Sequence, residues 1–272
     1  MALAVVTGGT SGIGKATAIG LAKAGHDVVL VARDPKRGES ARAEVQAVAP
    51  KAKVEFLACD LSSQKSVRAA AAQLKGRKGL SILVHSAGVF NPEKRMTEDG
   101  VEATLATNFV GGALLTDLLQ PTLEKNAPSR IVTVASKYGK TKIDFTDLQF
   151  ERRKFSYLKA VPQSKLAQVL WTQDLAERLQ GKGVIVNAVH PGLVRNTDLL
   201  ARTGGVFRWM TNRLGKDAAF GADTVVWLAT APEAAGETGG LWHKRKRIKT
   251  PGQGSDPAAR AALREATKKL IR

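Results

Sequence analysis

The glycine-rich segment after the first apolar run constrains this chain more than any other feature. The apolar run Ala2–Val6 predicts a buried strand, and Thr7–Gly14 (TGGTSGIG) separates it from a helical pattern. Glycines let such a turn reverse tightly and let a pyrophosphate approach the backbone, while the helix N-terminus offers unpaired N–H groups. Glycine-rich turns are common, but one placed between a first strand and a helix predicts a dinucleotide site.

The rest of the chain continues this alternation of strands and helices. Runs rich in Val, Ile and Leu predict strands at Ala2–Val6, Asp27–Val31, Val54–Cys59, Leu80–Val84, Arg130–Ala135, Val184–Val189 and, more briefly, Gly240–His243. Helical patterns occupy Ile13–Ala24, Lys36–Val48, Ser63–Leu74, Asp99–Asn126, Gln163–Leu179 and Asp256–Ile271. This order predicts right-handed crossovers. The expected fold is an α/β, Rossmann-type doubly wound parallel sheet of about seven strands with helices on both faces, in a single domain spanning residues 1–272.

Composition bounds the class of protein. Hydrophobic residues make up 43% of the chain, which indicates a globular protein, and no apolar run approaches the ~20 residues of a membrane span. The N-terminus has no basic flank or cleavage site, and the single cysteine, Cys59, excludes an internal disulfide. We therefore expect a cytoplasmic protein. No histidine has a metal-ligand partner at suitable spacing, so no metal site is expected.

The formal charge is +18, and the basic residues are spread along the chain apart from one run, His243–Lys249. Such a charge raises the question of a nucleic-acid or anionic-lipid partner. No zinc-ligand spacing, aromatic stripe or basic repeat accompanies it, so we expect no nucleic-acid partner. A basic groove for a phosphorylated cofactor explains only a small part of the charge.

The end of the second predicted strand indicates which nucleotide binds. An NAD site usually has an acidic residue there, about twenty positions after the glycine turn, to hold the ribose 2′-hydroxyl. This chain has Arg33, whose guanidinium suits a 2′-phosphate, and Lys15 is a second candidate cation. The alternative for Arg33 is an ordinary exposed arginine. The expected cofactor is NADP(H).

Further motifs follow other predicted strands: Asp60-Leu61, His85-Ser86-Ala87-Gly88, Ser136, and Pro191-Gly192 followed by Thr197. One more, Thr107-Asn108, lies within the predicted helix Asp99–Asn126. With Thr7–Gly14, they resemble the motifs of the short-chain dehydrogenase/reductase family over nearly the whole chain, although His85 and Ser86 replace two family asparagines. The resemblance implies catalytic roles for Ser136, Asn108 and Lys165. It also implies cofactor contacts from Gly8, Ser11, Gly12, Ile13, Gly14, Arg33, Asp60, Leu61, Ala87, Gly88, Lys165, Pro191, Gly192 and Val194.

Within that family, the chain is most similar to the retinol-dehydrogenase-like branch. The similarity rests on Ser164–Ala167 (SKLA), the long gap after Ser136, and a C-terminal Gly-Gly-Leu-Trp segment followed by basic residues. The branch mostly uses NADP(H) and bulky hydrophobic carbonyls or alcohols. By the same resemblance, residues around 198–215 form a substrate lid, whose apolar and basic side chains allow at most weak contact with a membrane surface. Family members are often dimers or tetramers, so a homo-oligomer stays open.

One member of the family's catalytic tetrad is missing. The family has a tyrosine acid/base four residues before the lysine, but Val161 stands there, next to Pro162. In the family, the serine orients the substrate oxygen and the asparagine holds a water that leads toward the lysine. The chain has only two tyrosines, Tyr138 and Tyr157. Tyr157 is a candidate catalytic substitute one turn earlier, although Pro162 predicts that the helix starts near it and leaves Tyr157 on a loop.

Three functions fit this sequence. The first is an NADP(H)-dependent oxidoreductase whose hydride adds to a conjugated C=C or a quinone, with Ser136 and Lys165 stabilising the enolate and water supplying the proton. The second is a non-redox enzyme, such as a cyclase, dehydratase or isomerase, on the same scaffold. The third is a nucleotide-binding protein without catalysis. We favour the first, because the cofactor residues, serine and lysine are all retained.

Overall fold

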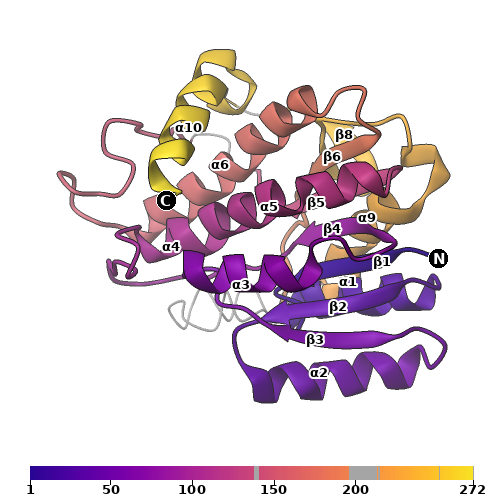
Figure 1. The fold of residues 1–272 in the computed structure, drawn as a ribbon. Helices are drawn as coiled ribbons and strands as arrows, with labels where there is room; N and C mark the ends of the chain where they lie inside the picture. The colour runs from indigo at the N-terminus through magenta and orange to yellow at the C-terminus, as the bar shows by residue number, and fades with distance from the viewer. Residues whose placement is uncertain (138–140, 196–212, 214, 251, 272) are drawn as a thin grey trace.

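The computed structural model describes residues 1–137, 141–195, 213, 215–250 and 252–271. Within them the chain builds one sheet in the order β3-β2-β1-β4-β5-β6-β7-β8, with helices on both faces (Figure 1). The strands are β1 (Leu3–Thr7), β2 (Asp27–Ala32), β3 (Val54–Ala58), β4 (Leu80–His85), β5 (Ser129–Val134), β6 (Val184–Val189), β7 (Leu241–His243) and β8 (Lys246–Ile248). The first seven are parallel and β8 is antiparallel to β7, which confirms the Rossmann-type fold with one more strand than predicted.

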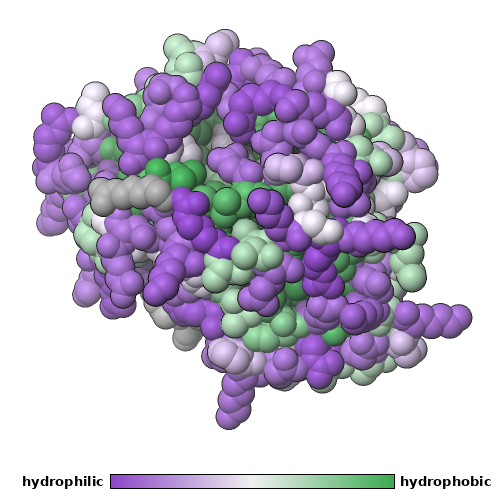
Figure 2. Space-filling view, viewed as in Figure 1, coloured by the Kyte–Doolittle hydropathy of each residue, from purple (hydrophilic) through white to green (hydrophobic). Residues whose placement is uncertain are grey.

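Each central strand is buried on both faces because its neighbouring residues enter two different cores. In β1, Val5 packs into the core beneath α3, α5 and α6, whereas Val6 packs into the core beneath α1, α2 and α9. The helices are α1 (Gly12–Lys23), α2 (Pro35–Val48), α3 (Gln64–Leu74), α4 (Ala103–Leu105), α5 (Gly111–Lys125), α6 (Tyr157–Arg178), α9 (Ala218–Thr230) and α10 (Pro257–Leu270). The surface seen in Figure 2 is mostly hydrophilic, with hydrophobic residues in smaller areas between.

The predicted helix Asp99–Asn126 begins four residues later than expected, at Ala103, and changes its winding partway. The chain forms α4, then a five-residue π-helix at Ala106–Val110, and only then α5. Single π turns of this kind occur mostly inside longer helices, frequently at functional sites. Here the π-helix contains Asn108.

The expected start of the helix that carries Lys165 is also wrong. We expected Gln163 as its first residue, but α6 begins at Tyr157 and continues through Pro162. The proline ring removes one N–H, which would otherwise donate to the carbonyl of Leu158, and Leu158 is 70% exposed. Water can satisfy that carbonyl, so the first turns of α6 tolerate the proline.

The expected lid around residues 198–215 lies almost entirely outside the described residues, as do Tyr138 and Thr197. None of the helices in the described part of the chain is long and apolar enough to cross a membrane. The described residues also contain no group of three or more His, Cys, Asp or Glu side chains that could hold a metal ion.

Candidate active site

The glycine turn between β1 and α1 lies at the point where the strand order reverses, since β1 has β2 on one side and β4 on the other. Ligands of open α/β sheets bind at such switch points. Gly8 has φ +66°, and a Cβ there would lie 2.7 Å from the Cα of Ala87; a Cβ at Gly14 would overlap the carbonyl of Gly8. Only glycine fits this close crossing of β1, β4 and α1, and the bare backbone it leaves fits a dinucleotide pyrophosphate at the start of α1.

The replaced asparagines after β4 do not disrupt this crossing. The hydroxyl of Thr7 accepts hydrogen bonds from the backbone N–H groups of Ser86 (3.2 Å) and Ala87 (3.4 Å). His85 is buried and bonds to Thr116 at 2.7 Å, and burial lowers the pKa of His85 to about 4. Thr7 and Thr116 therefore hold the end of β4 in place, although the two family asparagines are replaced.

The adenosine end of the predicted site has one uncommitted cation. Arg33 is exposed directly after β2, and no described residue forms an ion pair or hydrogen bond with its guanidinium. Lys15 is less available than predicted, because its ammonium lies 2.7 Å from Glu44, whose pKa this contact lowers. Asp34 caps α2 by accepting from the N–H of Arg37 at 3.1 Å. A guanidinium beside a committed carboxylate suits a 2′-phosphate better than a 2′-hydroxyl.

The adenine-side pair Asp60-Leu61 is fixed by short-range bonds. Asp60 accepts from the backbone N–H of Ser62 at 2.9 Å and from its hydroxyl at 2.7 Å. Leu61 is buried against the start of α5, where Gly111 lets the helix backbone approach the Leu61 carbonyl. This loop is thereby held after the end of β3, against the start of α5.

Asn108 joins three segments of the site. Its side-chain oxygen accepts from the N–H of Val89 at 2.7 Å, and its amide nitrogen donates to the hydroxyl of Ser164 at 3.0 Å. That hydroxyl donates to the carbonyl of Val161 at 2.8 Å. The backbone carbonyl of Asn108 accepts from the side chain of Gln168 at 2.6 Å. The sequence analysis missed Gln168, although its place one turn after Ser164 on the same helix was an available signal.

Lys165 lies at the centre of this group. Its side chain is buried (6% exposed), and its ammonium donates to the carbonyl of Val134 at 2.8 Å. Burial lowers the pKa of Lys165 to about 8. Ser136 follows two residues after Val134 at the end of β5, and Val161 is buried one helical turn before Lys165. Asn108 is therefore linked to α6 through Ser164, and Lys165 to the strand that Ser136 follows. The position one turn before Lys165 has no group that can carry a proton.

Tyr157, the candidate substitute, is engaged in an aromatic contact. Its ring centroid lies 4.5 Å from that of Phe90, with 55° between the ring planes. Tyr157 is the first residue of α6, one turn before Val161, and its phenol has no hydrogen-bond partner among the described residues. This contact explains how the ring of Tyr157 is packed, but it assigns no role to the hydroxyl.

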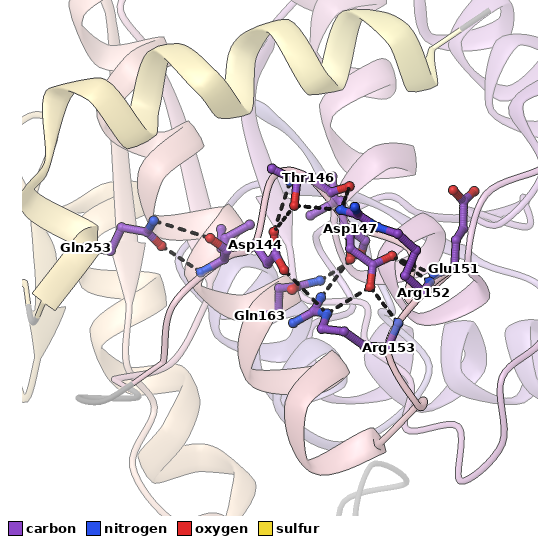
Figure 3. A network of polar contacts seen from close by, with 10 residues as sticks. Asp144, Thr146, Asp147, Glu151, Arg152, Arg153, Gln163 and Gln253 are labelled. Carbon is purple, nitrogen blue, oxygen red and sulfur yellow. Dashed lines mark hydrogen bonds and ion pairs between the residues drawn. The ribbon is translucent and has the colours of Figure 1, made fainter.

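The segment that leads from β5 to α6 is tied down by Asp147 (Figure 3). Its carboxylate accepts from the backbone N–H groups of Glu151, Arg152 and Arg153 and from the guanidinium of Arg153 at 2.9 Å. These bonds hold the pKa of Asp147 well below its usual range. Gln163 of α6 donates to the carbonyl of Leu148 at 2.9 Å. The segment that precedes α6 is thus fixed by polar contacts, most of them partly buried.

The turn after β6 also borders the candidate site. Gly192 has φ +79°, and Val194 is buried and bridges to Lys216. Gly221 of α9 lies between Val194 and Ile13, since a Cβ at Gly221 would lie 2.9 Å from one and 3.0 Å from the other. The turn after β6 and the glycine turn after β1 therefore both pack against Gly221 of α9.

Known proteins are similar to this chain in sequence and fold. The sequence profile of short chain dehydrogenase matches residues 2–204. The chain belongs to the short-chain dehydrogenase family. Retinol dehydrogenase 13 from Mus musculus is 36% identical over 278 residues, which cover 97% of this chain and 82% of that protein.

Two solved structures extend the comparison of this short-chain dehydrogenase. An uncharacterized protein from Mycobacterium paratuberculosis superposes with a TM-score of 0.82 at 29% identity, covering 100% of this chain and 93% of that one. An NADPH-bound short chain oxidoreductase from Pseudomonas aeruginosa PAO1, described as containing an atypical catalytic center, has a TM-score of 0.66 at 27% identity, covering 88% and 93%. The chain is therefore similar both to retinol dehydrogenases and to a family member with an unusual centre.

Proposed function

We propose that this short-chain dehydrogenase is an NADP(H)-dependent oxidoreductase that acts on a bulky hydrophobic enone or quinone-like carbonyl. The observation that carries the proposal is the pairing of a buried Lys165, 2.8 Å from the Val134 carbonyl, with Val161 in the position one turn earlier. The electrostatic part of the family's site is retained and the proton donor is absent. The NADPH-bound relative with an atypical centre supports this combination.

The preference for NADP(H) rests on Arg33. Its guanidinium is exposed at the end of β2 and is free of described ion-pair partners, whereas Asp34 is used as a helix cap. When bound, the cofactor supplies the hydride. Gly8, Gly12 and Gly14 hold its pyrophosphate, Asp60 and Leu61 flank the adenine, and Val194 flanks the nicotinamide in this proposal.

The chain's own residues then decide which carbonyl reacts. Ser136 orients the substrate oxygen, and the Lys165 ammonium stabilises the negative charge that develops there. A simple ketone concentrates that charge on one oxygen and needs a proton at once, which Val161 does not provide. An enone or quinone spreads the charge over a conjugated system, so its proton can come later from water.

The apolar surfaces beside this site suit a bulky substrate. Phe90 and Tyr157 present an aromatic pair at the start of α6. Leu158 is 70% exposed on the same turn, and Leu193, in the turn after β6, is 43% exposed. Exposed large apolar side chains at a site favour a hydrophobic ligand.

A turnover assay tests the proposal. Purified wild type and Val161→Tyr are supplied with NADPH and matched pairs of enones, quinones and saturated ketones. We expect wild type to reduce only the conjugated compounds, and Val161→Tyr to gain ketone reduction by about 10²–10⁴-fold, the usual contribution of general acid catalysis. Brisk ketone reduction by wild type contradicts the proposal. NADPH binding without any turnover favours the alternatives, a non-redox enzyme or a nucleotide-binding pseudoenzyme.

A further inference from the structure

A small pocket lies between the end of β6, the start of α9 and the turn that joins β7 to β8. Its volume is about 260 Å³, and its walls come from His190-Pro191 at the end of β6, the first turns of α9, and the residues that join β7 to β8. Neither the glycine turn Thr7–Gly14 nor any of Ser136, Asn108 and Lys165 lines it. The pocket is therefore distinct from the proposed hydride site, although it shares Pro191 with the turn that flanks that site.

The turn between β7 and β8 brings two cations to this pocket. His243 pairs with Lys246 across the hairpin, so Lys244 and Arg245 form a two-residue loop with φ values of +51° and +57°. Such loops are usually filled by Asn and Gly, which adopt left-handed φ without strain. Two long cationic side chains at these positions are uncommon. Backbone strain of this kind points toward a functional reason for the residues that bear it.

The two cations are held differently. The guanidinium of Arg245 forms an ion pair with Asp223 of α9 through a 2.8 Å bond, and its backbone N–H donates to Thr224 at 3.1 Å. Lys244 has no carboxylate partner among the described residues, and its ammonium lies 5.8 Å from the ring centroid of Phe220. Arg245 thus fixes the turn on α9, while the charge of Lys244 is left for a ligand.

Two histidines complete the wall with fixed tautomers. His243 Nδ1 lies 2.8 Å from the carbonyl of His190, so it carries the proton. His190 Nδ1 accepts from the N–H of Lys137 at 3.4 Å, so the proton of its neutral ring is on Nε2. Burial, together with His243 and Lys137, lowers the pKa of His190 to about 4, which keeps that ring neutral near pH 7. His190 therefore offers an N–H donor.

We propose that this pocket binds a small organic anion, a carboxylate with a compact apolar part. Lys244 pairs with the carboxylate, His190 donates a hydrogen bond through Nε2, and the apolar part rests on Phe220 and Pro191. The volume is below the usual range of about 300–1,000 Å³ for ligand pockets, which favours a single ring over a long chain. This site gives a role to the first three residues of the basic run, His243, Lys244 and Arg245, which the cofactor site does not explain.

The test is calorimetric titration of benzoate, with benzyl alcohol as its neutral counterpart and inorganic phosphate as an anion without an apolar part. Lys244→Asn removes the charge and keeps a residue that tolerates left-handed φ, so the hairpin is expected to fold. Lys246→Asn is the matched control, because Lys246 is exposed on β8 two residues further on.

We expect benzoate to bind wild type and Lys246→Asn alike, and Lys244→Asn about tenfold or more weakly, the effect of losing one charge-assisted contact. Benzyl alcohol and phosphate are expected to bind more weakly than benzoate. The proposal is overturned if wild type binds no benzoate, if Lys244→Asn binds it equally well, or if phosphate binds as tightly as benzoate.

Discussion

The side-chain amide of Gln168 donates to the backbone carbonyl of Asn108 at 2.6 Å, across the interface between α6 and the π-helix. In the family pattern described above, that asparagine holds a water leading toward the lysine. Here the lysine ammonium is directed to Val134 instead, at 2.8 Å. The asparagine carbonyl thus accepts from Gln168, and Val161 stands at the tyrosine position. Both features are consistent with the proposed chemistry, in which water supplies the proton.

The proposed role of Arg33 in the preference for NADPH can be tested directly. Arg33→Ala should weaken NADPH binding by about 1.5–3 kcal/mol, because one charge-assisted contact to the 2′-phosphate is lost. NADH binding should hardly change. The measurement is calorimetric titration of both cofactors. Arg42→Ala serves as the control, since Arg42 pairs with Glu39 on the exposed side of α2. Equal affinity of wild type for NADPH and NADH would contradict the assignment.

The buried ammonium of Lys165 predicts a pH dependence of cofactor binding. In the proposed complex, the charged form attracts the cofactor's ribose hydroxyls. Burial lowers the pKa of Lys165 to about 8, so the charge is lost as pH rises through that value. NADPH affinity should therefore fall above pH 8 in wild type. The same titration on Lys165→Met, which keeps the side chain's bulk without its charge, should show weaker binding and no such fall. A wild-type affinity that stays constant to pH 10 would show that this charge is not used.

Asp147 should contribute to the stability of the fold in a pH-dependent way, through the segment that precedes α6. Its pKa is held low by three backbone N–H groups and Arg153, so the folded state resists protonation more than the unfolded state does. Stability from this group is present at neutral pH and is lost as pH falls below the usual carboxyl range. Asp147→Asn should lower Tm at pH 7 and flatten its acid-side decline. Asp144→Asn, at a more exposed carboxylate of the same loop, should change both less.

Tyr157 is expected to contribute its ring and not its hydroxyl. Tyr157→Phe keeps the 4.5 Å contact with Phe90, so turnover of an enone should stay close to that of wild type. Tyr157→Ala should raise KM for bulky substrates, because half of the aromatic pair is removed. If the phenol is the acid, Tyr157→Phe alone would lower kcat by about 10²–10⁴-fold.

The sequence patterns were most accurate for strands that are buried on both faces. Strands such as Val184–Val189 were located to the residue, because apolar runs buried on both faces have sharp ends. β8 was missed since Lys246–Ile248 is mostly basic, and it pairs only because the two-residue turn returns it to β7. α9 was missed because Ala218–Thr230 is apolar nearly all round and contains a glycine, Gly221. That glycine allows α9 to pack closely against Ile13 and Val194.

The site divides in the same way. The glycine turn was predictable because close backbone approach admits few other residues. The structure adds that Gly8 lies against the backbone of Ala87, which the sequence alone did not predict. The contact between Gln168 and Asn108 was not predictable, since it depends on the π-helix, and a shift from α to π leaves no mark in apolar spacing. Pro162 misled the placement of the α6 start, because the rule that places proline in a first turn overlooks a solvated carbonyl.

The most direct test of the account is calorimetric titration of NADPH into wild type and Lys165→Ala, with the fold of each checked by circular dichroism. The account predicts that wild type binds NADPH although Val161 replaces the family tyrosine, and that Lys165→Ala binds it clearly more weakly. A wild type that binds no NADPH at any attainable concentration would contradict the central claim, that this chain keeps its cofactor after losing its proton donor.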